Sequence, residues 1–470
     1  MKEYEAEVLA TLLDIKYNST TDLYKNLKNS SFSRGSKREK KLFNFFGLNP
    51  PEDEEFDVPI QEKSEGQYML FEHQRLAVRN VISQLNVEPS RVLLHMPTGS
   101  GKTRTTMNVI CEHLRSFEPT VIVWLATSEE LCEQAIEEFK RSWSYLGNRC
   151  VNVYRYWGKH EVNIKEINDG FIVAGFNKIY NLINKSEGVS SIGKLASKTT
   201  FIVMDEAHQA IAPSYKMVLD LLYVGGGNKK LLGLSATPGR TWNDIDEDEK
   251  LANFFAKKKV RLEVKGYDNP IEYLTDNGYL AEVNFRQLFH DSEVLTGKDL
   301  EDLSTSIDIP KKTLEKLGQD KQRNLKILNE AEKLLKKHQR ILIFAPSVYN
   351  AELLSVLLRL RGFHANFITG KTMETDRKRI IEDFKNDDMT SKVLCNFGVL
   401  TTGFDAPKTS GAIIARPTLS LVLYSQMVGR AIRGQRAGGN QEAEIVTLID
   451  NELPGFGGVS EYFQNWEDVW

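Results

Sequence analysis

A glycine-rich segment supplies the first chemistry that the sequence can perform. Residues 96–103 read MPTGSGKT and lie between a short apolar run and a helical pattern. Gly99 and Gly101 let the backbone turn its N–H groups towards an anion, and the start of the helix adds partial positive charge. Lys102 can neutralise the β- and γ-phosphates of ATP, and the Thr103 hydroxyl can ligate Mg²⁺. We therefore expect nucleotide contacts from Pro97, Thr98, Gly99, Ser100, Gly101, Lys102 and Thr103.

A pair of carboxylates further along the chain complements this loop. Asp205 and Glu206 directly follow the apolar run 201–204. Open α/β sheets bind ligands at the carboxyl ends of their strands. We expect Asp205 to hold Mg²⁺, directly or through water, and Glu206 to orient and deprotonate an attacking water. Two solvated carboxylates at a strand end are the alternative, which their place downstream of a phosphate loop disfavours.

Short apolar runs that alternate with amphipathic stretches predict the elements that position these groups. Such a pattern is typical of parallel strands with crossover helices, so the expected fold class is α/β. In a first block the runs cover residues 91–95, 121–125, 170–174, 201–204 and 230–234. In a second block they cover residues 340–344, 365–368, 392–395, 411–415 and 444–448.

The two blocks predict two α/β domains with further segments around them. We expect a first domain over residues 69–285, a helical connector over 286–335 and a second domain over 336–455. Residues 1–68 differ from the rest in their Ser, Asn and Lys content and in an acidic break at 50–55, and they predict a helical appendage with a linker. Within that appendage, apolar spacing predicts one short helix over residues 5–14. Residues 456–470 form a tail.

Four motifs in order resemble superfamily 2 helicases. Asp205-Glu-Ala-His208 resembles their DEAH box, and Ser235-Ala-Thr237 resembles the element that links the ATP site to the domain interface. Residues 401–405, TTGFD, resemble the fifth motif, and residues 426–433, QMVGRAIR, resemble the sixth. The resemblance spans roughly residues 69–455. It implies two tandem RecA-like domains that hydrolyse Mg-ATP between them, with coupling through His208, Ser235 and Thr237 and with Asp405 tied into the ATP site.

The sixth motif predicts how the second domain reaches ATP. Gln426, Arg430 and Arg433 are spaced i, i+4 and i+7, which predicts one face of a helix. By the resemblance, Arg433 is the arginine finger and Arg430 supports it. An arginine at the γ-phosphate is worth ~10³–10⁵ in rate, and it acts only when the two domains close. An exposed basic helix end is the alternative.

Upstream, residues 71–74 resemble the adenine-reading element of the same superfamily. The Gln74 amide offers a donor and an acceptor together, which suits the edge of adenine. A preference for ATP over other nucleotides follows as a hypothesis.

In this family, nucleic acid lies across the tops of both domains and is held mainly through phosphates. The expected contacts are loop residues after strands, each of which could equally be an ordinary helix cap or turn. They are Thr127, Ser128, Asn177, Lys178, Ser347, Gly370, Lys371 and Thr402.

Individual residues within and next to the motifs bear on the kind of nucleic acid that is bound. Ala126 and Gly175 depart from the Pro and Thr that relatives commonly carry, which puts particular contacts in doubt. Residues 402–407 and 416–424 resemble motors of type I restriction enzymes and RadD-type bacterial repair ATPases. This resemblance favours DNA over RNA and a role in DNA repair or phage defence.

Bulk composition narrows the class of protein. The chain has 470 residues, 41% of them hydrophobic and 27% charged, which is ordinary for a soluble globular protein of two or three domains. A net charge of -3 argues against binding nucleic acid by bulk charge, although a motor needs only a local strip of contacts. The four cysteines form no CxxC pair, so neither zinc nor a disulfide framework is expected. Without a secretory signal or a membrane span, a cytoplasmic location is expected.

Three other functions remain to be weighed. Glu263-Val-Lys265, with Asp246 or Asp248 upstream, has the form of a nuclease strand, although such short matches are common. A regulatory ATPase or clamp could bind nucleic acid, or dock a protein through residues 1–68 or the aromatic end 463–470, without separating strands. Packing of the aromatic end onto the second domain is the favoured alternative for that segment. A nucleotide kinase or transporter ATPase leaves the sixth motif and the second α/β block without explanation.

Overall fold

A computed structural model describes most of the chain. The described residues are 1–49, 60–223, 229–236, 245–264, 266–267, 269–297, 299, 308–400 and 404–453, with the backbone alone for 245–247. Thr237, Thr402, Lys265, the Asp246 side chain and the aromatic end therefore lie outside the described residues. The chain divides into two units, residues 1–66 and residues 67–470, and each is described by itself.

The first unit contains three short helices, α1 (Glu3–Leu12), α2 (Thr20–Lys28) and α3 (Lys37–Phe45). Ala6, Ala10 and Leu23 form its small core. Arg38 ties α3 to the end of α1 because its Nη2 donates to the Leu13 carbonyl at 2.6 Å. The helix predicted over 5–14 is confirmed, whereas α2 and α3 were not predicted because their sequences are polar.

The first lobe of residues 67–470 contains a parallel sheet in the order β3-β4-β2-β5-β6-β1-β7. Its strands are β1 (Arg91–His95), β2 (Val121–Ala126), β3 (Val153–Tyr156), β4 (Gly170–Gly175), β5 (Thr199–Met204), β6 (Lys230–Ser235) and β7 (Lys259–Val260). Its helices are α4 (Glu72–Leu85), α5 (Lys102–Ser116), α6 (Glu129–Leu146), α7 (Phe176–Ile183), α8 (Gly188–Lys198), α9 (Pro213–Tyr223), α10 (Ile245–Phe254) and α11 (Pro270–Asp276).

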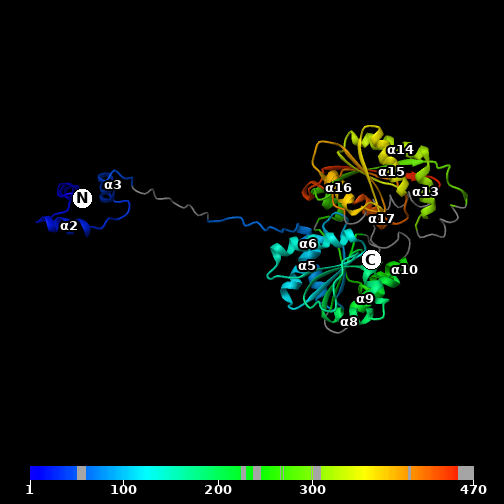
Figure 1. The fold of residues 1–470 in the computed structure, drawn as a ribbon, viewed down its shortest axis with the longest axis horizontal. Helices are drawn as coiled ribbons and strands as arrows, with labels where there is room; N and C mark the ends of the chain where they lie inside the picture. The colour runs from blue at the N-terminus through cyan, green and yellow to red at the C-terminus, as the bar shows by residue number, and fades with distance from the viewer. Residues whose placement is uncertain are drawn as a thin grey trace. The chain divides into compact units, whose positions relative to one another are not determined.

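Both faces of this sheet are buried because successive strand residues point to opposite sides. Leu94 and Trp124 belong to the core beneath α4, α5 and α6, whereas Leu93 and Val123 belong to the core beneath α7, α8 and α9. Figure 1 shows α5 and α6 on one side of the lobe and α8 and α9 on the other. This two-sided burial explains why the strands are continuous apolar runs.

The second lobe contains a parallel sheet in the order β10-β11-β9-β12-β13-β8. Its strands are β8 (Glu282–His290), β9 (Arg340–Phe344), β10 (His364–Thr369), β11 (Lys392–Phe397), β12 (Gly411–Ile414) and β13 (Glu442–Asp450). Its helices are α13 (Lys311–Gln319), α14 (Lys321–Leu335), α15 (Val348–Leu360), α16 (Glu374–Lys385) and α17 (Leu421–Val428). The α/β prediction of two parallel sheets with flanking helices is confirmed, and each predicted apolar run overlaps a strand.

The predicted helical connector over 286–335 is wrong in its first residues. Residues 286–290 belong to β8, which pairs in parallel with β13 at the edge of the second sheet. Most of the side chains of β8 are partly or fully exposed, so the strand shows no apolar run in the sequence. α14 is helical as expected, but it packs onto the second lobe, where the buried Arg323 pairs with the buried Asp450 at 2.8 Å.

The described residues bear on three further expectations from the sequence. Glu263 lies outside the named strands, and the next residue, Val264, forms only an isolated bridge to Tyr267, so no described feature supports a nuclease strand there. Of the helices within the described residues, none has the length and apolar character that crossing a bilayer requires. All four cysteines are free thiols, and three of them are buried.

Candidate active site between the two lobes

The phosphate loop lies between β1 and α5. Gly99 and Gly101 have φ values of +91° and +89°, a region that favours glycine, and α5 begins at Lys102. The Lys102 Nζ donates to the Met96 carbonyl at 2.9 Å, which keeps the ammonium group folded against the loop. Burial lowers the pKa of Lys102, and the nearby Glu206 and Asp205 oppose that shift. The loop therefore presents a partly buried cation beside two glycines, which fits a bound polyphosphate.

α4 supports this loop from the side. The Gln74 Nε2 donates to the Ser100 carbonyl at 2.9 Å, and a His73 ring nitrogen lies 3.2 Å from the same oxygen. A Cβ on Gly101 would lie 2.2 Å from the Gln74 Nε2, so the loop passes very close to α4. The Thr98 hydroxyl is buried and has no hydrogen-bond partner among the described residues, which leaves it for a ligand.

The acidic pair lies at the carboxyl end of β5, as predicted. Glu206 has a φ of +54°, and its backbone N–H donates to the Asp205 Oδ1 at 3.0 Å. Burial raises the pKa of Asp205, and the adjacent Glu206 adds to the rise. Two neighbouring, partly buried carboxylates are stabilised by a cation, and oxygen ligands of this kind suit Mg²⁺. Asp205 and Thr103 are therefore the residues whose chemistry fits the metal that ATP would bring.

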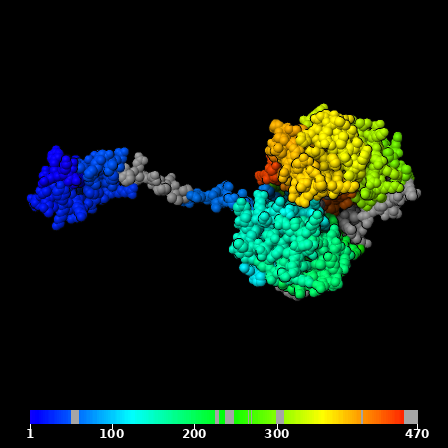
Figure 2. All heavy atoms as spheres, viewed as in Figure 1, coloured from blue at the N-terminus to red at the C-terminus, as the bar shows by residue number. Residues whose placement is uncertain are grey.

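The second lobe reaches this pair directly. The Gln426 Nε2 on α17 donates to the Glu206 Oε1 at 2.8 Å, a contact between side chains from different lobes. The space-filling view shows the two lobes of residues 67–470 in contact (Figure 2). A Cβ on Gly99 would lie 2.7 Å from the Arg433 Nη1, so this guanidinium covers the phosphate loop. Gln426 and Arg433 thus bring the sixth motif to the two halves of the expected ATP site.

The expectation that Gln426, Arg430 and Arg433 share one helix face is wrong. α17 ends at Val428, and Arg433 lies in an extended segment that forms an antiparallel bridge with Leu280. The backbone bond from Ala281 N–H to the Ile432 carbonyl, at 3.0 Å, belongs to the same pairing. The spacing pattern failed because this partner segment lies far away in the sequence.

The remaining members of the predicted ATP site surround this core. The Arg430 Nη1 donates to the Phe404 carbonyl at 2.6 Å, and an Arg433 Nη2 lies 3.6 Å from the Asp405 Oδ1. These contacts join the end of the fifth motif to the sixth. Burial lowers the pKa of Arg430, and the neighbouring Arg433 adds to that shift.

Two of the coupling residues lie beside the same groups. The buried His208 has its Nδ1 3.4 Å from the Glu206 Oε2. Ser235 ends β6, and its carbonyl accepts the Met96 N–H at 3.1 Å, so the third motif contacts the start of the phosphate loop. Their coupling roles stay predictions.

In the first lobe, the predicted nucleic-acid contacts gather at one place. Thr127, Ser128, Asn177 and Lys178 line a hollow of about 490 Å³ beyond the ends of β2 and β4. Ser128 caps α6, since its hydroxyl accepts the Leu131 N–H at 3.3 Å. The Lys178 Nζ donates to the Gly158 carbonyl at 3.0 Å and pairs with Glu161 at 2.9 Å, so it already has partners.

In the second lobe, the predicted contacts are separated. Ser347 is buried and caps α15, because its hydroxyl accepts the Asn350 N–H at 3.1 Å. Gly370 and Lys371 are exposed just beyond β10. The cap accounts for Ser347 by itself, and Gly370 and Lys371 remain open to a ligand.

Two contacts at this interface were not predicted from the sequence. Arg377 on α16 pairs with Glu130 on α6, across the lobes. Tyr279, next to the bridge that holds Arg433, packs against Phe71 with the ring centroids 4.4 Å apart and the ring planes tilted by 45°. Both depend on segments that meet only in the folded chain.

Two families of known domains match the chain. Residues 67–240 match the type III restriction enzyme res subunit, and residues 323–435 match the helicase conserved C-terminal domain. The phosphate loop and the acidic pair fall in the first match, and the sixth motif falls in the second. The chain carries the two-domain core of a superfamily 2 helicase. A place in the DEAH or RadD-type subgroups remains a prediction.

Two curated relatives are similar in sequence to this chain, and one of them is named as a putative helicase. The chain is 26% identical to the putative ATP-dependent helicase IRC3 of Saccharomyces cerevisiae over 78% of its own length and 49% of the relative's. It is also 26% identical to a 51.5 kDa protein of a Lactococcus phage over 58% of its own length and 53% of that protein's. The chain thus spans about half the length of the curated relatives it matches.

Solved structures share the fold of this helicase core at low identity. The helicase MrfA bound to DNA superposes with a TM-score of 0.58 at 16% identity, over 84% of this chain and 51% of that one. A fragment of an HsdR subunit of a type I restriction enzyme from Vibrio vulnificus gives 0.57 at 15%, over 99% and 80%. The DEAD-box helicase Mss116 bound to single-stranded RNA gives 0.58 at 18%, over 81% and 70%. The fold alone therefore does not separate DNA from RNA.

Proposed function

We propose that this helicase core hydrolyses ATP between its lobes and uses the cycle to move along DNA. The observation that carries the proposal is the hydrogen bond from the Gln426 Nε2 to the Glu206 Oε1 at 2.8 Å. It joins the expected general base in one lobe to the sixth motif in the other. Hydrolysis then requires the lobes to be together, and their separation after hydrolysis provides a stroke.

Each residue at this interface has a distinct role in the proposal. Bound Mg-ATP supplies the phosphoryl group and the metal charge, with Lys102 on the phosphates and with Thr103 and Asp205 towards Mg²⁺. Glu206 takes the proton of the attacking water, and Gln426 and His208 hold its carboxylate in place. Arg433, which covers the phosphate loop, stabilises the charge that develops on the γ-phosphate, and Arg430 supports it.

DNA is the proposed track because of the restriction-enzyme relatives. The match over residues 67–240 is to a restriction-enzyme subunit, and the MrfA structure contains DNA. The equal TM-score of the RNA-bound Mss116 means that both polymers belong in the test.

The deciding experiment is steady-state ATP hydrolysis, alone and with single-stranded DNA, duplex DNA, forked DNA or RNA, compared between the unaltered chain and Glu206→Gln. We expect stimulation by DNA, loss of turnover in Lys102→Ala, and a drop of about 10²–10⁴-fold in Glu206→Gln, the usual contribution of a general base. Strand-displacement and triplex-displacement assays then separate unwinding from translocation.

Three results would change the proposal. Near-normal turnover in Glu206→Gln contradicts the general-base role. Stimulation by RNA alone contradicts the DNA track. Hydrolysis that responds to none of the polymers leaves an ATPase and points to a protein partner, beginning with residues 1–68.

A further inference from the structure

The ion pair between Arg377 and Glu130 joins the lobes at a second place, remote from the ATP site in sequence. The Arg377 Nη1 donates to the Glu130 Oε1, and its Nη2 donates to the Thr369 carbonyl at 3.2 Å. The side chains are 21% and 37% exposed, so the pair is partly shielded from solvent. We propose that Glu130 and Arg377 form an interlobe clasp, a positioning pair that holds the lobes in the arrangement required for hydrolysis. The inference rests on the proposed ATPase function.

The clasp lies beside the expected nucleic-acid track. Glu130 is in the first turn of α6, two residues after the Ser128 cap. On the other side, Thr369 ends β10 and directly precedes Gly370. The pair therefore links the two lobe edges that carry the predicted phosphate contacts. The lobe arrangement that the clasp stabilises is also the one in which a nucleic-acid strand can contact both edges.

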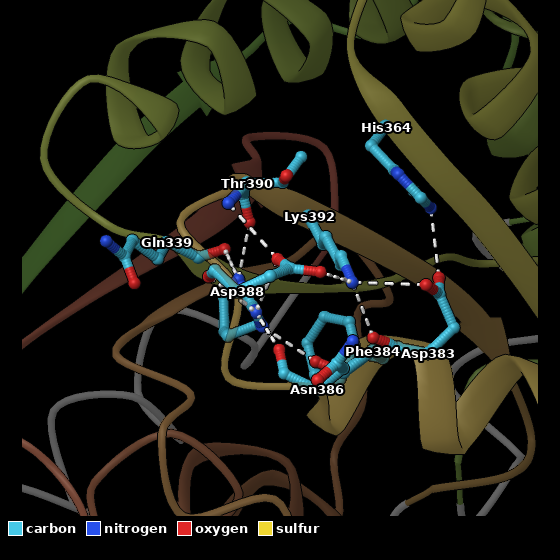
Figure 3. A network of polar contacts seen from close by, with 9 residues as sticks. Gln339, His364, Asp383, Phe384, Asn386, Asp388, Thr390 and Lys392 are labelled. Atoms are coloured by element: carbon cyan, nitrogen blue, oxygen red, sulfur yellow. Dashed lines mark hydrogen bonds and ion pairs between the residues drawn. The ribbon is translucent and has the colours of Figure 1, made fainter.

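Arg377 is presented by a helix that is fixed to its own lobe. Lys392, at the start of β11, donates from its Nζ to the Asp383 carbonyl in the last turn of α16. The same Nζ donates to the Asp388 Oδ2 just beyond the helix, each bond being 2.7 Å long (Figure 3). The Arg340 Nε donates to the Phe384 carbonyl at 2.7 Å, and both basic residues are buried. This network ties α16 to the starts of β9 and β11, so Arg377 follows the second lobe as it moves.

Glu130 is presented in the same way by the first lobe. On the next turn of α6, Glu133 pairs with Arg155 of β3 at 2.8 Å, which ties the helix to the sheet. Because both helices are tied to their sheets, the ion pair forms only when the lobes meet in this orientation. It therefore stabilises the closed arrangement alone.

Other charged residues around the ion pair also attract one another across the two lobes. The pKa of Lys378 on α16 is raised by Glu374 on its own helix and, more weakly, by Glu133 and Glu137 on α6. The acidic face of α6 thus attracts the basic side of α16 beyond the single hydrogen bond. A partly shielded ion pair of this kind shifts an equilibrium by about fivefold.

The test is a charge swap. We expect Arg377→Glu and Glu130→Arg each to lower the kcat of DNA-stimulated ATP hydrolysis by about fivefold, and the double variant Glu130→Arg/Arg377→Glu to recover most of it. The KM for ATP is expected to stay within about twofold, because neither residue touches the phosphate loop. Arg379→Glu is the matched control on the same helix, since Arg379 pairs with Asp376 of that helix.

A second measurement follows the lobes directly. The exposed Cys150 of the first lobe and a Met389→Cys substitution at an exposed site of the second lobe accept a donor and an acceptor dye, the other three cysteines being buried. With a non-hydrolysable ATP analogue, energy transfer is expected to show a smaller closed fraction in each single variant. The double swap is expected to restore it.

The outcomes separate the two proposals. If the unaltered chain does not hydrolyse ATP, the proposed function fails. If it does, and the single variants match Arg379→Glu in rate and closed fraction, the clasp is wrong. A double swap no better than the single variants, with all melting temperatures unchanged, also overturns it.

Discussion

Gln74 uses both ends of its amide within the protein. Its Oε1 accepts the Phe71 N–H at 3.0 Å, and its Nε2 donates to the Ser100 carbonyl at 2.9 Å. An amide has a second N–H and a second lone pair, so one donor and one acceptor remain for a base. The residue can therefore support the phosphate loop and also contribute to reading adenine, as its resemblance to the adenine-reading element implies.

These two roles predict different losses in Gln74→Ala. We expect weaker binding of both ATP and GTP by about tenfold, because the hydrogen bond that holds the loop at Ser100 and the one that caps the start of α4 at Phe71 are both lost. Any preference for ATP is expected to be lost as well. Equilibrium titration with fluorescent ATP and GTP analogues measures both effects. As a comparison, Gln74→Glu keeps the acceptor for Phe71 but replaces the donor to Ser100 with a carboxylate oxygen and adds a negative charge, so we expect it to bind both nucleotides no better than Gln74→Ala. Unchanged affinity for both nucleotides would rule out both roles.

At the scale of elements, the end of α17 brings the second lobe close to the phosphate loop. Gly429 follows the last helical residue with φ near -59°, a conformation open to any residue. A Cβ there would lie 2.0 Å from the Thr98 Cγ2 in the other lobe. The glycine is thus required by the approach of the lobes and not by its own backbone.

This geometry predicts that Gly429→Ala impairs turnover but not folding. We expect the melting temperature to be unchanged or slightly higher, since alanine reduces the entropy of the unfolded chain. The rate of hydrolysis is expected to fall by about tenfold or more, because overpacking costs roughly 1–3 kcal/mol in the closed arrangement alone. Gly193→Ala in α8 is the matched control, as its added Cβ would meet nothing within 4 Å. Equal rates in the two variants would contradict the prediction.

At the scale of the whole molecule, residues 1–66 and 67–470 form separate units. The first has its own small core around Leu23, and the cores of the lobes contain none of the residues described within 1–49 and 60–66. Within the second unit, Tyr68 is already part of the first lobe, where its hydroxyl donates to the Glu138 Oε1 at 2.5 Å. The boundary of independent folding therefore falls before Gln67.

Removal of residues 1–66 is expected to leave a folded ATPase. The melting temperature of residues 67–470 is expected to lie within about 2 °C of that of the full chain, because no core residue is lost. Calorimetry and the hydrolysis assay without polymer measure these properties. Any difference between the two forms in stimulation by DNA then measures what the N-terminal unit contributes. A large fall in stability would show instead that the units share a core.

Local patterns determined most of the nucleotide site. Each of these features lies within a few consecutive residues: the phosphate loop, the acidic pair and the ten apolar runs. Their backbone conformations depend mainly on neighbouring residues in the sequence. β3, β7 and β8 were missed because they are edge strands with partly exposed side chains, which lack the apolar runs of central strands. The polar helices α2 and α3 were missed for a similar reason.

The tertiary structure decided how the two lobes share the site. Spacing placed Arg433 on a helix with Gln426, whereas pairing with Leu280 holds it in an extended segment. The Glu130–Arg377 pair joins residues 247 positions apart, and no local pattern marks either of them. Sequence periodicity records which face of an element is buried. It does not record which distant segment covers that face, because that choice depends on the packing of the whole chain.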